Sequence, residues 1–141
     1  MYFINKNKFI GVLVFLFIGI FCFAQESTDK NGPKLTFDNE MHSYGNVHVN
    51  DVPEGNIFKT DISFTNTGNG PLILDTVKVC CNVTLIDWSK EPVMPGEKGM
   101  IKVNLKVHQR VPHRINRSVV VHSNCRDESV VRYRLRGMLV N

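Results

Sequence analysis

The stretch from Phe58 to Val107 constrains the fold of this chain most strongly, because short alternating segments and turn signals follow one another along it. Phe58, Ile62 and Phe64 alternate with charged and hydroxyl residues, which is the period of two expected of a β-strand with one buried side. Residues 67–71 (Thr-Gly-Asn-Gly-Pro) form a turn signal, and residues 101–107 alternate again. This stretch therefore predicts half of a β-sandwich.

The rest of the chain adds similar segments, and none of them has a sustained helical period. Residues 82–99, which hold the only tryptophan, Trp88, are expected to form a long irregular corner. The pattern predicts an all-β fold, an immunoglobulin-like antiparallel β-sandwich, with a jelly roll or a small closed barrel as alternatives. We predict about seven short strands, among them a broken edge strand over 35–49 and strands over 57–65, 72–79, 100–107, 115–122 and 129–140.

The N-terminus has the pattern of a secretory signal peptide. Lys6 and Lys8 precede an uncharged apolar run over 9–23, and Ala24 and polar residues follow it. An uncleaved anchor, or a lipoprotein acylated at Cys22, would be the alternatives. We predict a signal peptide over 1–24, a flexible tether over 25–34 and a single domain over 35–141, exported to the periplasm or to the cell surface and beyond.

The charge of the chain is unevenly distributed. The formal net charge of +4 includes Lys6 and Lys8, so the chain after cleavage carries about +2, which is too little to indicate a nucleic-acid partner. Residues 25–97 are close to −6, whereas residues 98–141 are close to +8. Residues 98–141 are therefore the basic half of the chain, and residues 25–97 are the acidic half.

A row of arginines marks the last predicted strand. Arginines at positions 132, 134 and 136 alternate there with Val131, Tyr133 and Leu135, so one side of the strand is apolar and the other is cationic. Lys102 and Lys106, on another outward side, are expected to join them against anionic lipid, a glycan or an acidic partner. The alternative is a solvated strand whose charges prevent aggregation. The candidate interaction face consists of Arg132, Arg134 and Arg136.

The cysteines and histidines show no metal or catalytic pattern. Three cysteines remain after cleavage, an odd number for an exported protein. Antiparallel pairing of the strand that ends near Cys80 with residues 114–123 would place Cys125 near Pro71, too far for a disulfide with Cys80 or Cys81. No serine or cysteine has a recognisable base beside it. We expect no enzymatic activity, no cofactor and no metal, although these cysteines and the histidines His42, His48, His108, His113 and His122 would be the available ligands.

Four motifs resemble those of a known family. They are residues 64–72 (Phe-Thr-Asn-Thr-Gly-Asn-Gly-Pro-Leu), 88–92 (Trp-Ser-Lys-Glu-Pro), 95–99 (Pro-Gly-Glu-Lys-Gly) and 135–137 (Leu-Arg-Gly). On these motifs, residues 35–139 resemble the bacterial domain-of-unknown-function family 1573, immunoglobulin-like modules akin to those of ciliary hydin proteins. The resemblance implies an exported, non-catalytic domain.

Members of that family often carry a Ser-Cys-Gly-Cys-Thr element, and residues 80–84 are its equivalent in this chain. Cys81 and Thr84 match the element, whereas Cys80 replaces its serine and Val83 replaces its second cysteine. We take Cys80, Cys81 and Thr84 as a candidate thiol element in which the second of the family's two cysteines is missing.

These observations predict an exported, non-catalytic binding or scaffolding module of the bacterial cell envelope. Its expected partner is an envelope protein or an anionic surface component, with no nucleic acid and no stable membrane span after cleavage. The alternative is a periplasmic metal-binding or thiol-redox protein that uses Cys80 and Cys81. A third possibility is self-assembly by strand addition at the broken first strand, near Gly45.

Overall fold

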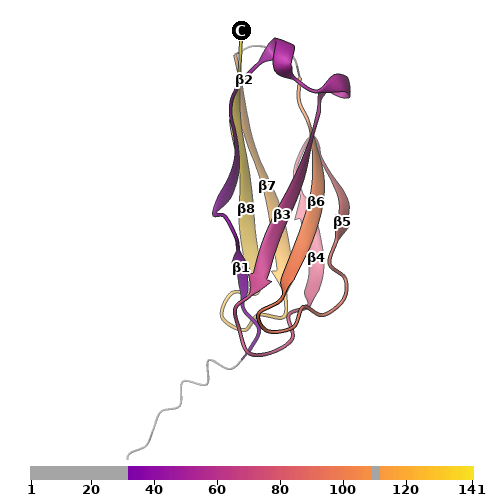
Figure 1. Cartoon of the computed structure of the whole chain (residues 1–141), viewed down its shortest axis with the longest axis vertical. Coiled ribbons are helices and arrows are strands. Elements are labelled where there is room, and N and C mark those ends of the chain that lie inside the picture. The colour runs from indigo at the N-terminus through magenta and orange to yellow at the C-terminus, as the bar shows by residue number, and fades with distance from the viewer. Residues whose placement is uncertain (1–31, 109–111) are drawn as a thin grey trace, which may run out of the picture. The chain divides into compact units, whose positions relative to one another are not determined.

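The computed structural model describes residues 32–108 and 112–141, and eight strands in them form two sheets that face each other (Figure 1). The first sheet has the strand order β1-β3-β6-β5, and the second has the order β2-β8-β7-β4. The fold is an immunoglobulin-like β-sandwich, as the sequence predicts. The strands are β1 (Leu35–Phe37), β2 (Met41–His48), β3 (Ile57–Asn66), β4 (Leu74–Val79), β5 (Val83–Trp88), β6 (Lys98–Lys106), β7 (His113–Ser123) and β8 (Val130–Val140).

The first extended segment is two strands rather than one broken edge strand, which corrects the prediction and adds one strand. β1 pairs with β3 in the first sheet, and β2 pairs in parallel with β8 in the second. The polar residues 38–40 are where the chain crosses between the sheets. Asp38 fixes this crossing, because its backbone N–H donates to Ser63 O and its carboxylate accepts bonds from the Ser63 and Thr65 hydroxyls.

The predicted irregular corner over 82–99 also needs correction, since its first part is strand β5. β5 pairs antiparallel with β6, and its register shifts between Leu85 and Asp87. That shift interrupts the period of two, which is why the sequence hides the strand. Trp88 lies at the end of β5, half-buried against the core.

The core lies between the inner sides of the two sheets. Phe64 of β3 and Leu135 of β8 are both fully buried. A Cβ atom added to Gly99 of β6 would overlap the Phe64 ring, so only glycine permits this close approach. The rest of the core is built mainly from alternate residues of the paired strands, including Ile62, Ile101, Val103, Leu105, Ile115, Val119, Val121, Tyr133 and Leu139.

One polar link crosses the core between the sheets. The Tyr44 hydroxyl of β2 and the Thr60 hydroxyl of β3 are 2.6 Å apart, and Thr60 is buried. The Tyr44 ring also packs against Phe58, with 5.1 Å between the ring centroids, and against His42, with 4.5 Å. Burial raises the pKa of Tyr44 and lowers that of His42. These contacts attach β2 to the first sheet.

Asn66 organises the loops at one end of the sandwich. It is fully buried, and its Nδ2 donates to the carbonyls of Gly70 and Val93. Its Oδ1 accepts bonds from the backbone N–H groups of Lys34 and Gly68. The hydrogen-bonded chain therefore begins before Leu35, within the segment predicted to be a tether.

Each of the four edge strands is interrupted or very short. β2, β4 and β5 all carry register shifts, and β1 has three residues. Such irregularities discourage pairing with a strand from another molecule. The edges therefore argue against self-assembly by strand addition near Gly45.

The predicted signal peptide and most of the predicted tether fall on residues 1–31, outside the described residues. Within 32–108 and 112–141, no helix is long and apolar enough to cross a membrane.

Candidate functional site

Five cationic side chains lie on the outer side of the second sheet. Arg132, Arg134 and Arg136 alternate along β8 with Tyr133 and Leu135, which are buried, so the three guanidinium groups point away from the core. The strand register adds Lys78 of β4, because Val120 of β7 stands opposite both Lys78 and Arg132, and it also adds Arg114 of β7. We call this surface the cationic face and define it by Lys78, Arg114, Arg132, Arg134 and Arg136.

Arg114 belongs to the cationic face through the pairing of β7 with β8. It stands opposite Met138, and its neighbour on the same side of β7, Asn116, stands opposite Arg136. Arg114 is therefore diagonal to Arg136, at a separation that long side chains can bridge. The sequence predicted the three arginines of β8 but missed Arg114 and Lys78. The alternation in residues 114–122 could have identified Arg114 as an outward residue. Lys78 could be assigned to this surface only from the pairing of β4 with β7.

The cationic face has almost no negative charge to balance it. β2, β7 and β8 contain no aspartate or glutamate, and β4 contains only Asp75. Asp75 and Glu40, which precedes β2, lie at the margins of the sheet. The ion pairs among the described residues are Lys90–Asp87 and Lys98–Asp38, so none of the five cations has a carboxylate within pairing distance in that part of the chain.

Lys102 and Lys106 do not join the arginines, contrary to the prediction. Both lie on β6, on the outer side of the first sheet, which is the opposite side of the sandwich. Lys102 stands between Asp61 of β3 and Asp87 of β5 in register. The sequence could not reveal this, because outward positions of two different sheets have the same period.

Arg117 does not belong to the cationic face, because it lies on the inner side of β7 with Ile115 and Val119. Its Nη1 donates to its neighbour's carbonyl, Asn116 O, at 3.0 Å, and its buried Nε has no hydrogen-bond partner among the described residues. It lies just before the point along β7 where the pairing with β4 begins, at Val119. An inward-pointing charge at such an unpaired edge discourages strand addition, so we assign Arg117 a structural role.

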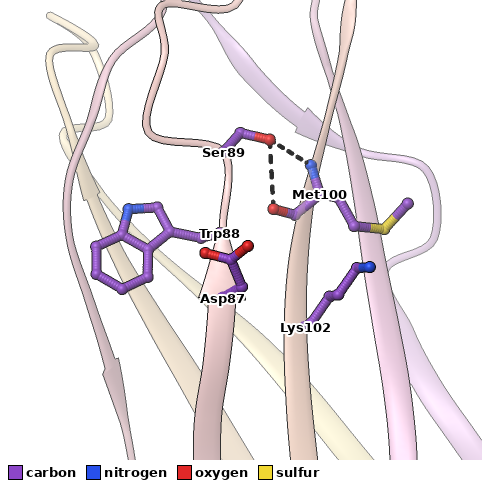
Figure 2. A pocket seen from close by; sticks show the side chains of 5 residues that line it. All are labelled: Asp87, Trp88, Ser89, Met100 and Lys102. Atoms are coloured by element: carbon purple, nitrogen blue, oxygen red, sulfur yellow. Dashed lines mark hydrogen bonds between the residues drawn. The ribbon is translucent and has the colours of Figure 1, made fainter.

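A shallow hollow of about 140 Å³ lies on the first sheet, beside β5 and β6 (Figure 2). Ser89 Oγ accepts a hydrogen bond from Met100 N and lies 3.4 Å from Met100 O. The lining residues Asp87, Trp88, Ser89, Met100 and Lys102 include no histidine or cysteine. Since the serine hydroxyl contacts backbone groups, the hollow lacks the paired nucleophile and base that nucleophilic catalysis needs.

The candidate thiol element is dispersed. Cys80 is half-buried at the end of β4, where its Sγ accepts a hydrogen bond of 3.2 Å from Ser118 N. Cys81 is exposed in the following turn, and Thr84 is exposed on β5. Cys80 therefore takes a structural role in closing the ladder between β4 and β7.

Cys125 lies at the other end of β4. β4 runs antiparallel to β7, as predicted, with Leu74 opposite Ser123, and Asn124 Nδ2 donates to Pro71 O. The three cysteines of the described region have free thiols, and Cys125 is buried. Within that region, no three side chains of histidine, cysteine, aspartate or glutamate gather closely enough to hold a metal ion.

Comparisons with known proteins place this fold in a family without assigning an activity. A family model described as "Protein of unknown function (DUF1573)" matches residues 35–139. No curated protein matches the chain.

Solved structures with a similar fold include two bacterial proteins. A protein of unknown function from Porphyromonas gingivalis W83 has a TM-score of 0.62 and 16% identity, and the match covers 79% of this chain and 49% of that one. The secreted serine protease VesC from Vibrio cholerae has a TM-score of 0.58 and 14% identity, and the match covers 74% of this chain and 23% of that one. The chain thus spans half or less of the length of these two structures.

Proposed function

The chain belongs to the DUF1573 family of proteins of unknown function, and from this premise we propose that it is an exported, non-catalytic binding module of the bacterial cell envelope. Its cationic face is the surface that contacts an anionic envelope component. The apolar run over 9–23 behind Lys6 and Lys8 supports export, to the periplasm or the cell surface.

The observation that carries this proposal is the unbalanced charge of the cationic face. Five cations on one side of a sheet repel one another and disfavour the folded state slightly unless something neutralises them. Arginine suits an anionic partner, because its planar group binds carboxylate and phosphate with two parallel hydrogen bonds.

The alternative function, metal binding or thiol-redox chemistry at Cys80 and Cys81, has less support. Cys80 Sγ is engaged with Ser118 N, and residue 83 is a valine where the family element often has its second cysteine. A thiol-redox pair needs two sulfur atoms within bonding reach, whereas Cys80 is half-buried against β7 and Cys81 is exposed in the following turn.

A binding experiment on the envelope tests the proposed function. The exported protein is purified from cells, mixed with envelope fractions of the producing bacterium and sedimented. R132Q/R134Q/R136Q should lose most of the bound fraction. The matched control K59Q/K102Q/K106Q replaces the exposed Lys59 of β3 together with Lys102 and Lys106 of β6. It removes the same charge from the outer side of the first sheet and should bind like the wild type. Equal loss in both variants, or in neither, would contradict a role for the cationic face.

Export is tested separately on the same material. N-terminal sequencing of the exported protein should begin at Gln25 if Ala24 precedes the cleavage site. Recovery of the protein only in the cytoplasm, with Met1 retained, would contradict the proposed location.

A further inference from the structure

We propose that the cationic face docks on the surface of an anionic phospholipid bilayer, with the second sheet lying along the headgroups. This inference rests on the proposed function and narrows its partner from an anionic envelope component to lipid phosphate. Three features of the cationic face support it: the spacing of the cations, the absence of phenylalanine, tyrosine and tryptophan from the outward positions around them, and the apolar side chains beside them.

The spacing of the cations favours a partner with many separate anionic groups. Alternate residues of a strand lie about 7 Å apart, so Arg132, Arg134 and Arg136 span about 14 Å along β8. Arg114 and Lys78 extend this row across β7 and onto β4. The cations therefore form a layer rather than a pocket, and a layer of headgroups can neutralise all five together.

The side chains between the cations favour lipid over a protein or a nucleic acid. The outward positions of β2, β4, β7 and β8 carry no phenylalanine, tyrosine or tryptophan, since Tyr44 and Tyr133 point inward. Protein interfaces usually centre on aromatic anchors, and single-stranded nucleic acids stack their bases on aromatic rings. Headgroup phosphates need neither feature.

Two exposed apolar side chains lie beside the arginines. Met41 of β2 pairs in register with Arg134 and is 40% exposed, and Val130 begins β8 with 49% exposed. Apolar groups next to cations fit the boundary between headgroups and acyl chains, where peripheral proteins combine apolar contact with electrostatic attraction.

The expected strength follows from the number of cations. Each lysine or arginine near an anionic bilayer increases partitioning about fivefold, so three arginines together contribute about 100-fold. High salt should remove this attraction, because the screening length falls to about 3 Å at 1 M ionic strength.

The test is sedimentation with vesicles, using the exported protein as cells process it. One vesicle set is phosphatidylcholine alone, and the other contains about one third phosphatidylglycerol, which supplies the negative surface potential. The variants are R132Q/R134Q/R136Q, the control K59Q/K102Q/K106Q and M41S/V130T. All of them share one N-terminus, so any contribution from the apolar run over 9–23 cancels between them. Thermal melts confirm that each variant folds.

We expect the wild type and the lysine control to bind the phosphatidylglycerol vesicles, with about 100-fold weaker partitioning for the arginine variant. The apolar variant should be several-fold weaker, and vesicles of phosphatidylcholine alone should bind little protein. Equal vesicle binding by the arginine and lysine variants would overturn the inference. Arginine-dependent binding to envelopes without binding to these vesicles would also overturn it, but would leave the proposed function intact and indicate an acidic protein or glycan.

Discussion

The outer sides of the two sheets carry cations in similar numbers and differ in how those cations are balanced. On the first sheet, Lys102 stands between Asp61 and Asp87 in register, and Lys98 Nζ lies 2.7 Å from the Asp38 carboxylate. On the second sheet, the cationic face has no carboxylate opposite any of its members. A strand face that is merely solvated explains the paired charges of the first sheet. It gives no reason for the unpaired cations of the second sheet.

The difference originates in which segments pair. The basic half of the chain divides between the sheets, since β6 joins the first and β7 and β8 join the second. β6 lies between β3 and β5, which bring Asp61 and Asp87 from the acidic half. β8 lies between β2 and β7, which bring no carboxylate at all. Topology, rather than net charge, therefore creates the unbalanced surface.

The largest expected effect tests whether the two sheets are equivalent on their inner sides. Phe64→Ala on the first sheet should lower the free energy of unfolding by about 3–5 kcal/mol, and Leu135→Ala on the second by about 2–5 kcal/mol, because each leaves a cavity. Urea denaturation measures both. A loss confined to one sheet would mean that the sheets differ in packing as well as in surface charge.

A smaller effect is expected at the polar link between the sheets. Tyr44→Phe should cost about 1–2 kcal/mol in the free energy of unfolding, because it leaves the buried Thr60 hydroxyl without its partner. The double variant Y44F/T60V removes both hydroxyls and should recover part of that loss. Additive losses in urea denaturation would show that the two hydroxyls do not act as a pair.

The sequence predicted the sandwich, because the alternation in residues 58–64 and 101–107 reports burial on one side of each strand directly. It failed at β5, where a register shift hides the period, and at residues 38–40, where a polar interruption within one apparent strand is a crossing between sheets.

At the site, the alternation identified Arg132, Arg134 and Arg136 but assigned Lys102 and Lys106 to the same surface. Period alone gives the side of a strand and not the sheet that contains it. Only pairing revealed that Asp61 and Asp87 flank Lys102 and that Arg114 and Lys78 join the arginines.

Charge substitutions should change stability in opposite directions on the two outer sides. Asp61→Asn removes an attraction for Lys102 and should lower the free energy of unfolding by a few tenths of a kcal/mol at low salt. Arg134→Gln relieves repulsion from Arg132 and Arg136, and should leave stability unchanged or raise it by about 0.5 kcal/mol. Urea midpoints at low salt and at 1 M salt measure both effects, which should vanish at high salt. The same sign for both variants would remove the contrast between the sheets.

The smallest expected effect is an acid-dependent loss of stability on the first sheet, at Asp38. The hydrogen bond from Lys98 Nζ, followed by those from the Ser63 and Thr65 hydroxyls, lowers the pKa of Asp38 from 3.8 to about 2. The folded state thus favours the carboxylate, so its contribution is complete above about pH 4 and is lost as the pH falls towards 2. Because the carboxylate is solvated, the contribution is small.

Urea midpoints of the wild type and Asp38→Asn, measured from pH 5 to pH 2, isolate this group. The wild type should be more stable at pH 5, and the gap should close as Asp38 is protonated. Since Lys98 gives the largest contribution to the lowered pKa, Lys98→Gln should reduce both the gap and its pH dependence. A gap that persists unchanged at pH 2 would mean that Asp38 stabilises the crossing between the sheets by its shape and not by its charge. Charge pairing at Asp38 would then not be one of the features that distinguish the cations of the first sheet from those of the cationic face.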